Sequence, residues 1–429
     1  MNFIYIITFL GFIETLILFI SALRAYIFTI IAIISRRRKS KSNPHKEDAD
    51  PVINNYFVSV LLPIYNEPNV VDRLLKACTS FDFPNYEVIV VDDSTDETTS
   101  ILKKWEKHPR VKLIHRDTRR GWKGGALNTG LDHTDPRSTH VLVLDADFIP
   151  PPDLLQRFLE KFNDDGVVVV QGYQKHTLNK DENWMTKGIR LSFSVYNLIE
   201  LNAKGVLGLP VPITGCVYMI RTELIKKLRY AEDITEDWNL TLRLYEEGYK
   251  VHYDPDLAAA GECPSTLRRF FRQQMRWAEG HTRNFRMHFW RIMRAKTLSL
   301  KEKSEFLTIG TTYLNSILTL MLTLAWLLTL AFPSYAMSLP HVPLGIYLTL
   351  SCIPAAIFSA AVALTWEGSA RECLRLPYMI FLYYIATPVV AYAALKGLFT
   401  NGGYFHRTYK TGRITDTSAL NWKRDEVAT

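Results

Sequence analysis

The chain has 429 residues, of which 48% are hydrophobic, 22% charged and 12% aromatic. This composition excludes a disordered chain, which would be poor in apolar residues, and a short disulfide-rich scaffold. The five cysteines are odd in number and form no Cys-x-x-Cys pair, which argues against a disulfide framework and a structural zinc site. Because the length exceeds that of one average domain, we expect two or more structural units.

The first element predicted along the chain is a transmembrane helix over residues 1–34. This segment is longer than the roughly 20 apolar residues that a spanning helix needs, and it lacks the short core and cleavage site of a signal peptide. Five basic residues between positions 36 and 41 follow it and contribute to the formal net charge of +8. We interpret them as a positive-inside anchor, not as a nucleic-acid patch. We therefore expect an integral membrane protein with no nucleic-acid partner.

A basic, then polar linker (35–55) precedes a soluble α/β domain that we place at 56–289. Within this domain, short apolar runs alternate with polar segments of helical length. This pattern is typical of buried, mostly parallel strands that are separated by crossover helices. The apolar runs are Val58–Pro63, Val88–Val91, Val111–Ile114, Val141–Leu144 and Val167–Val170.

The C-terminal block turns apolar again after an interfacial segment (290–304). Its membrane region, 305–399, contains two predicted spans, Phe306–Phe332 and Pro343–Trp366. A third stretch, Pro377–Phe399, has basic residues on both sides and contains two prolines. We therefore interpret this stretch as re-entrant or interfacial. Residues 400–429 would then form a cytoplasmic tail.

Acidic side chains follow three of the predicted strands. Glu67 lies in the loop after the first, Asp92 and Asp93 end the second, and Asp145-x-Asp147 ends the fourth. In doubly wound sheets, ligands bind beyond the carboxyl ends of the strands. Carboxylates accept hydrogen bonds from ribose and base N–H groups, and a D-x-D pair suits Mg²⁺ or Mn²⁺ on a diphosphate. Taken alone, an Asp-Asp-Ser turn is also a common helix N-cap, and D-x-D is common in loops.

Two further segments carry residues suited to nucleotide-sugar chemistry. In the glycine-rich loop 119–128, Lys123 can answer phosphate charge at a helix start, although the spacing matches neither a P-loop nor G-x-G-x-x-G. A plain glycine-rich turn explains this loop equally well. In Thr235-Glu236-Asp237, a carboxylate can act as general base toward an acceptor hydroxyl. The local pattern also fits a helix start with Thr235 as its N-cap.

The segment 270–277 places Gln273, Arg276 and Trp277 at helical spacing. Arginine can neutralise a leaving diphosphate, and an indole offers a face on which a sugar stacks. An amphipathic helix on the membrane surface is the alternative interpretation, and both can hold for one helix.

In this order, the motifs make residues 58–277 resemble the membrane-integrated, processive family 2 glycosyltransferases, such as cellulose, mannan, chitin and hyaluronan synthases. The resemblance is carried by Asp92-Asp93, Asp145-x-Asp147, Thr235-Glu236-Asp237 and Gln273-x-x-Arg276-Trp277. It implies an α/β fold of the GT-A type, with a mostly parallel nucleotide-sugar domain and α-helical transmembrane and interfacial segments.

The resemblance also implies roles for individual residues. Asp237 would be the catalytic base, beside Glu236 and Thr235, and Asp145 and Asp147 would bind the metal. The acceptor would contact Trp277, Cys216, Gly215 and Thr214. The segment 405–410 is similar to the F-x-x-T-x-K gating loop of cellulose synthases. The donor nucleotide would contact Asp92, Asp93, Lys123, Glu67, Asp145, Gln273, Arg276, Phe405, Thr408 and Lys410.

The activity implied is inverting transfer of a hexose from a nucleotide sugar, which we expect to be UDP-linked, onto a growing polysaccharide. It would need Mg²⁺ or Mn²⁺ and take place at the cytoplasmic face of the cell membrane, among membrane lipids. Only two clear spans follow the catalytic block, so a homo-oligomer or a lipid acceptor could replace an export channel. The alternatives are a glycolipid-forming transferase that acts on ceramide or diacylglycerol, and a non-catalytic membrane receptor or transporter subunit.

Overall fold

A seven-stranded sheet forms the centre of the α/β domain in a computed structural model that describes residues 2–41, 55–164, 166–331, 342–405 and 407–417. The strand order is β3-β2-β1-β4-β6-β5-β7. β6 runs antiparallel to β4 and β5, and the other neighbours are parallel. The predicted mostly parallel sheet is therefore confirmed. Its strands are β1 (Val58–Ile64), β2 (Tyr86–Asp92), β3 (Val111–His115), β4 (His140–Val143), β5 (Val169–Lys175), β6 (Tyr218–Arg221) and β7 (Val251–Ala260).

The five predicted strands correspond to β1–β5, but β6 and β7 were not predicted. β6 is only four residues long, and β7 contains Asp254, Pro255 and Asp256. β6 is too short and β7 too interrupted to stand out in the sequence, so pairing with β4 and β5 within the folded domain defines them.

Apolar side chains cover both faces of the sheet. In β1, Val60 and Leu62 belong to one buried cluster, while Leu61 belongs to the other, as the alternation of a strand requires. The helices of this domain are α2 (Val71–Cys78), α3 (Thr98–Lys103), α4 (Trp122–Asp132), α5 (Leu154–Leu159), α6 (Trp184–Val195), α7 (Asn202–Leu207), α8 (Thr222–Leu228) and α9 (Glu236–Glu246), with a π-helical turn (Tyr196–Leu201) between α6 and α7.

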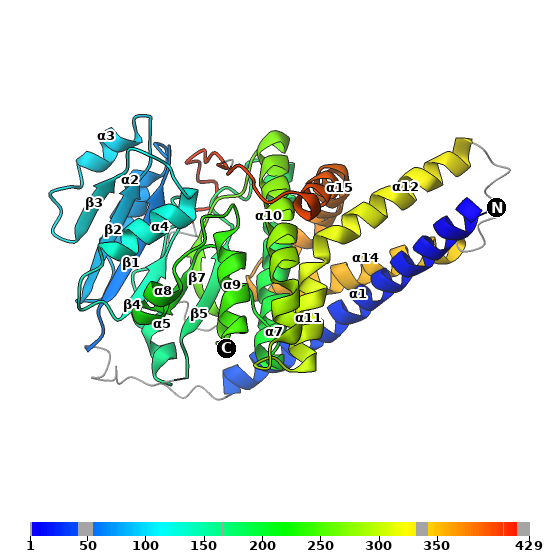
Figure 1. The fold of residues 1–429 in the computed structure, drawn as a ribbon, viewed down its shortest axis with the longest axis horizontal. Coiled ribbons are helices and arrows are strands. Elements are labelled where there is room, and N and C mark those ends of the chain that lie inside the picture. The colour runs from blue at the N-terminus through cyan, green and yellow to red at the C-terminus, as the bar shows by residue number, and fades with distance from the viewer. Residues whose placement is uncertain (1, 42–54, 165, 332–341, 406, 418–429) are drawn as a thin grey trace.

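Three apolar helices extend away from the sheet on one side of the molecule (Figure 1): α1 (Asn2–Lys41), α12 (Asn315–Ala331) and α14 (Val342–Trp366). α1 packs along α14. Among the described residues, three helical segments are long and apolar enough to cross a membrane, with one shorter apolar helix, Cys352–Trp366. The three are Phe9–Arg38, Leu300–Leu324 and Ala370–Phe399.

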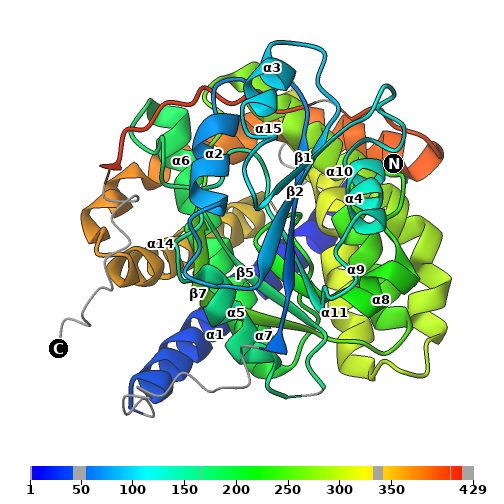
Figure 2. The same ribbon diagram turned by 90° about the vertical axis from the view of Figure 1, so that its left-hand side faces the viewer.

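The last helix, α15 (Leu376–Phe399), packs against α10 (Leu267–Arg294), which stands between the sheet and the apolar helices (Figure 1). A side chain in place of Gly397 would lie 2.5 Å from the carbonyl of Glu279, so the two helices approach closely. α15 is seen nearly end-on in Figure 1 and lengthwise in Figure 2, so its axis runs across those of α1, α12 and α14. Its re-entrant or interfacial placement stays a prediction, because length and composition also allow a span.

Candidate active site

A cavity of about 160 Å³ lies beyond the carboxyl ends of β1 and β4. We call it the first cavity. α4, α9 and α10 contribute to its walls, and the C-terminal segment covers it with Phe405, Arg407, Thr408 and Lys410. In Figure 1 this segment runs from α15 back toward the sheet. All the site residues predicted from the sequence line this cavity except Asp92 and Cys216.

Asp92 and Cys216 have other surroundings. The carboxylate of Asp92 is fully buried and accepts hydrogen bonds from the Ser94 N–H (2.9 Å) and the Thr99 hydroxyl (2.6 Å). The ring of His115 lies 2.9 Å away. Asp92 therefore shapes the loop after β2. The Cys216 side chain packs into the apolar core beneath the sheet.

Aromatic and basic side chains gather at the Asp93 end of the first cavity. Arg116 donates to both carboxylate oxygens of Asp93 at 2.6 and 2.5 Å. The guanidinium of Arg119 lies over the Tyr65 ring at 3.6 Å and near the Phe405 ring at 5.3 Å. Each carboxylate oxygen has two acceptor positions, so Asp93 can still receive a hydrogen bond from a base. The flat rings and the guanidinium suit a planar heterocycle.

Both aspartates of the D-x-D motif are paired with lysines. The Lys123 ammonium, in the first turn of α4, lies 2.6 Å from Asp145, and the Lys410 ammonium lies 2.6 Å from Asp147. Burial alone would raise the pKa of Asp147, but Lys410 outweighs it and the pKa is lowered. Lys123 also donates to the Gly215 carbonyl at 2.7 Å. A diphosphate placed here would meet two ammonium groups.

Glu67 faces the same space from the loop after β1. Its side chain is buried, and this desolvation raises its pKa to about 8, although Arg407 opposes the shift from 3.6 Å. Glu67 is therefore neutral over much of the physiological pH range and can donate a hydrogen bond as well as accept one.

The predicted catalytic motif begins α9. Thr235 is at the N-cap position, but its side chain makes no capping bond and instead accepts from Asn284 at 2.9 Å. Burial raises the pKa of both Glu236 and Asp237, while Lys123 opposes each shift. Gly215 has a φ of +91°, and a Cβ there would lie 3.1 Å from the Asp237 carboxylate. Only glycine therefore leaves the space beside Asp237 open.

A second cavity, of about 460 Å³, meets the first one at Asp237, Thr214 and Trp277. It extends to Arg24 on α1, the predicted membrane helix. Its walls combine charged groups with aromatic rings of the kind that pack on sugars. Asp237 thus stands where two chambers join, one polar and one leading toward the membrane helices. The rings are Phe193, Tyr196, Trp238, Phe270, Trp277, His281 and Tyr313.

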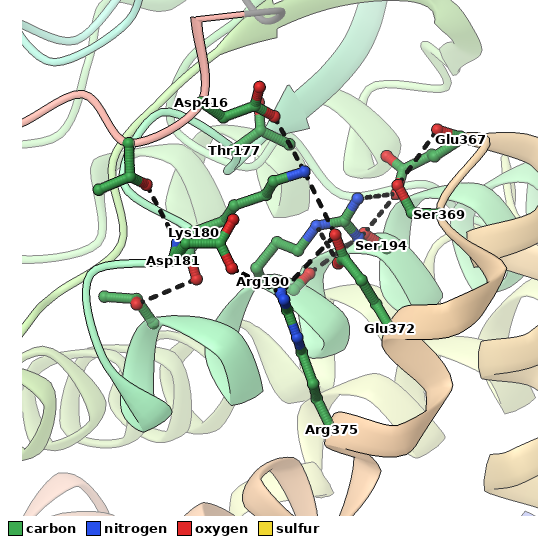
Figure 3. Close-up of polar contacts among 12 residues, drawn as sticks. Thr177, Lys180, Asp181, Arg190, Ser194, Glu367, Ser369, Glu372, Arg375 and Asp416 are labelled. Atoms are coloured by element: carbon green, nitrogen blue, oxygen red, sulfur yellow. Dashed lines mark hydrogen bonds and ion pairs between the residues drawn. The ribbon is translucent and has the colours of Figure 1, made fainter.

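The C-terminal segment that covers the first cavity is fixed at its far end. Lys180 pairs with Asp416 at 2.9 Å and with Glu372 at 3.2 Å (Figure 3). The Thr415 N–H donates to the Leu178 carbonyl at 2.7 Å. The cover is thereby tied to the turn Ala370–Arg375, which precedes α15.

Several residues of the first cavity were not singled out from the sequence. Gln174 and His176 continue β5 beyond its apolar run, so no local pattern marks them. Arg119 stands in the glycine-rich loop already noted, where its basic charge is a signal. The polar, charged and aromatic members of this set are Tyr65, Arg119, Phe148, Gln174, His176, Phe193 and Arg407.

Comparison with known proteins agrees with this geometry. Residues 59–229 match the family described as Glycosyl transferase family 2. The chain therefore carries a family 2 glycosyltransferase domain, as the motifs had indicated. Glucomannan 4-beta-mannosyltransferase 1 of Oryza sativa subsp. japonica is 27% identical over 65% of this chain and 56% of its own length. Probable glucomannan 4-beta-mannosyltransferase 9 of the same organism is 31% identical over 61% of this chain and 52% of its own length. The chain thus spans about half the length of these relatives.

A solved structure shares the fold over nearly the whole chain. It is the mannosyltransferase PcManGT from Pyrobaculum calidifontis, in complex with GDP-Man and Mn²⁺. The TM-score is 0.57 at 22% identity, with 92% of this chain and 99% of that chain covered. The predicted GT-A fold class is confirmed.

Proposed function

We propose that this protein is an inverting β-hexosyltransferase that moves a hexose from a nucleotide sugar onto a growing polysaccharide at the cytoplasmic face of the cell membrane. The observation that carries the proposal is the position of Asp237, which lines both cavities. A donor in the first cavity and an acceptor in the second would therefore meet at one carboxylate.

The chemistry that follows is a single displacement. Asp237 takes the proton of the acceptor hydroxyl while the hydroxyl oxygen bonds to C1 of the sugar. The bond from C1 to the diphosphate oxygen breaks, and the nucleoside diphosphate leaves with the electron pair. Since C1 is attacked on the face opposite the leaving group, an α-linked donor gives a β-linked product. No covalent enzyme intermediate is needed.

Basic residues around the first cavity are suited to receive the leaving group. Lys123, Arg276 and Lys410 all line it, and fixed positive charges there would stabilise the negative charge that develops on the diphosphate. Lys123 also links the D-x-D side of the cavity to α9, because it contacts both Asp145 and, at 3.3 Å, Glu236. The donor site and the base are thus held in one arrangement.

A divalent cation fits the D-x-D side of this cavity. Asp145 and Asp147 offer hard oxygen ligands of the kind that Mg²⁺ and Mn²⁺ prefer, and in this structure each carboxylate is matched with an ammonium group. We propose that these two aspartates hold the cation. When bound, it would neutralise diphosphate charge.

The relatives bear on the sugar and the acceptor. Their names specify transfer of mannose into glucomannan, which favours a mannosyl donor and a polysaccharide acceptor for this chain as well. The aromatic walls of the second cavity support a saccharide acceptor. Our expectation of a UDP-linked donor is therefore tested beside a GDP-linked one.

The test is product analysis. Membranes containing the full chain are incubated with Mn²⁺ and, in separate reactions, radiolabelled GDP-mannose, UDP-glucose and UDP-N-acetylglucosamine. We expect label from one donor to enter a polymer that a linkage-specific endo-β-hydrolase degrades. A single hexose on organic-extractable lipid would show a glycolipid-forming transferase instead. Binding of a donor without any transfer would indicate a receptor or transporter subunit.

A further inference from the structure

His176 is a buried imidazole in the wall of the first cavity, just beyond β5 (Val169–Lys175). Only 6% of its surface is exposed. Its Nδ1 lies 2.9 Å from the carbonyl oxygen of Glu262, whereas its Nε2 is buried and has no hydrogen-bond partner in the part of the chain that the structure describes. An unpartnered buried nitrogen is costly unless something binds it.

The contact with Glu262 fixes which nitrogen carries the proton. A carbonyl oxygen only accepts hydrogen bonds, so Nδ1 must be the donor. In a neutral imidazole with the proton on Nδ1, Nε2 presents a lone pair. Histidines that bind metals are commonly oriented in this way, with the other ring N–H donated to a backbone carbonyl.

The backbone of Glu262 orients both His176 and Asp147. Its N–H donates to the Asp147 carboxylate at 3.2 Å, and its carbonyl receives the His176 N–H. The rings of Phe193 and Phe148, with centroids at 3.9 and 5.5 Å, restrict the imidazole further. His176 and Asp147 are therefore held by one residue and line the same cavity.

We propose that Nε2 of His176 is a ligand of the divalent cation, beside Asp147. The inference rests on the proposed function. In the described residues no three His, Cys, Asp or Glu side chains gather as a preformed metal site, so diphosphate oxygens and water would complete the coordination. Lys410 must first leave Asp147, with which it pairs at 2.6 Å. An imidazole ligand would also favour Mn²⁺ over Mg²⁺.

The test is pulsed electron paramagnetic resonance of Mn²⁺ bound to the purified full chain. Inorganic pyrophosphate serves as a nitrogen-free stand-in for the donor, and the protein is prepared with ¹⁴N- or ¹⁵N-histidine. We expect an imidazole coupling that changes with the isotope and disappears in His176→Gln. The variant should also bind Mn²⁺ about tenfold more weakly and lose its preference over Mg²⁺.

His140→Gln is the matched control. His140 is also buried, with an unpartnered Nε2, but it begins β4 at the opposite end from the D-x-D motif and does not line the first cavity. This variant should keep the coupling. If His176→Gln does not fold, the wild-type chain still tests the assignment, because the absence of any histidine coupling there would overturn it.

The outcomes separate the two claims. Mn²⁺ that binds with pyrophosphate but shows no histidine coupling would overturn the assignment of His176 and leave the proposed function standing. If the wild-type chain bound no Mn²⁺ with pyrophosphate, the metal site of the proposed function would itself be wrong.

Discussion

This molecule contains two buried clusters of charged side chains, and they differ in whether their polar groups can still bind a ligand. The first, which we call the anchoring cluster, joins α6 to the turn before α15 and to the C-terminal segment. Arg190 pairs there with Glu367 at 2.7 Å and with Glu372 at 3.1 Å (Figure 3). Lys180 pairs with Glu372 and Asp416. Each of these cations faces carboxylates of the protein itself.

The cluster in the first cavity is also paired, yet it retains open binding capacity. Lys123 and Lys410 hold the two D-x-D aspartates, while Gln273 Oε1, Thr408 Oγ1 and His176 Nε2 have no hydrogen-bond partner among the described residues. All three residues line the first cavity. Ion pairs alone therefore do not mark a functional site. In the anchoring cluster, Arg190 Nε and Glu372 Oε2 also make no hydrogen bond, but they lie 3.1 Å apart in an ion pair. Unpartnered polar atoms in residues that line a cavity therefore distinguish a site that binds a ligand from one that fixes the fold.

The largest expected effect is on catalysis. Asp237→Asn removes the proposed base while preserving size, so transfer should fall by roughly 10²- to 10⁴-fold. Nucleotide affinity, measured by titration calorimetry, should stay near that of the wild type. Asp132→Asn is the control. Asp132 is the last residue of α4 and forms an exposed ion pair with Arg229. Lost nucleotide affinity in Asp237→Asn would reassign that residue to donor binding.

Breaking the anchoring cluster should lower the stability of the fold. Arg190→Met leaves Glu367 buried without its cation and leaves Glu372 with Lys180, which should cost about 3–5 kcal/mol in the free energy of unfolding. Arg137→Met, which breaks an exposed pair with Asp135, should cost far less, because solvent screens an exposed pair. Denaturant unfolding in detergent measures both. Equal losses in the two variants would contradict the distinction between the clusters.

Glu67 should make stability depend on pH. Its pKa rises from 4.5 to about 8 on folding, so between these values the folded chain holds a proton that the unfolded chain has lost. The contribution of Glu67 to the free energy of unfolding is fully present below pH 4.5. It is lost as the pH rises to 8, at up to about 1.4 kcal/mol per pH unit. Glu67→Gln cannot ionise and should lack this slope. A stability difference between the two proteins that is constant across the window would refute the shift.

The smallest expected effect concerns Lys410. Because its ammonium occupies Asp147, Lys410→Met should strengthen Mn²⁺ binding without nucleotide by about tenfold, or about 1.4 kcal/mol. The same change should weaken nucleotide binding, since one diphosphate contact is lost. Lys161→Met, whose partner is Asp254 outside the cavity, should change neither. Weaker Mn²⁺ binding by Lys410→Met would mean that the lysine supports the metal site.

Much of this arrangement could be predicted from local sequence. Apolar runs predict the buried strands β1–β5. The aspartates of the D-x-D motif come just after β4, so their position at the sheet edge could be inferred. Asp92 shows the limit. Successive side chains of a strand point in opposite directions, so Asp92 and Asp93 cannot both face one cavity. The sequence alone does not say which of them does.

Other features depend on contacts between distant segments. His176 gains its role from Glu262 and Asp147, which come from different parts of the chain. The second cavity likewise requires α1 to bring Arg24 beside α6 and α9. Patterns within a short window carry no information about such contacts.

The central claim is that donor and acceptor chambers meet at Asp237. An experimental structure of the full chain with Mn²⁺ and the nucleoside diphosphate of its active donor tests this most directly. We predict that the diphosphate lies between Lys123 and Lys410, that the base lies beside Asp93, and that the Asp237 carboxylate faces the terminal phosphate across a sugar-sized gap. A nucleotide bound outside the first cavity, or turned so that its terminal phosphate points away from Asp237, would contradict the account.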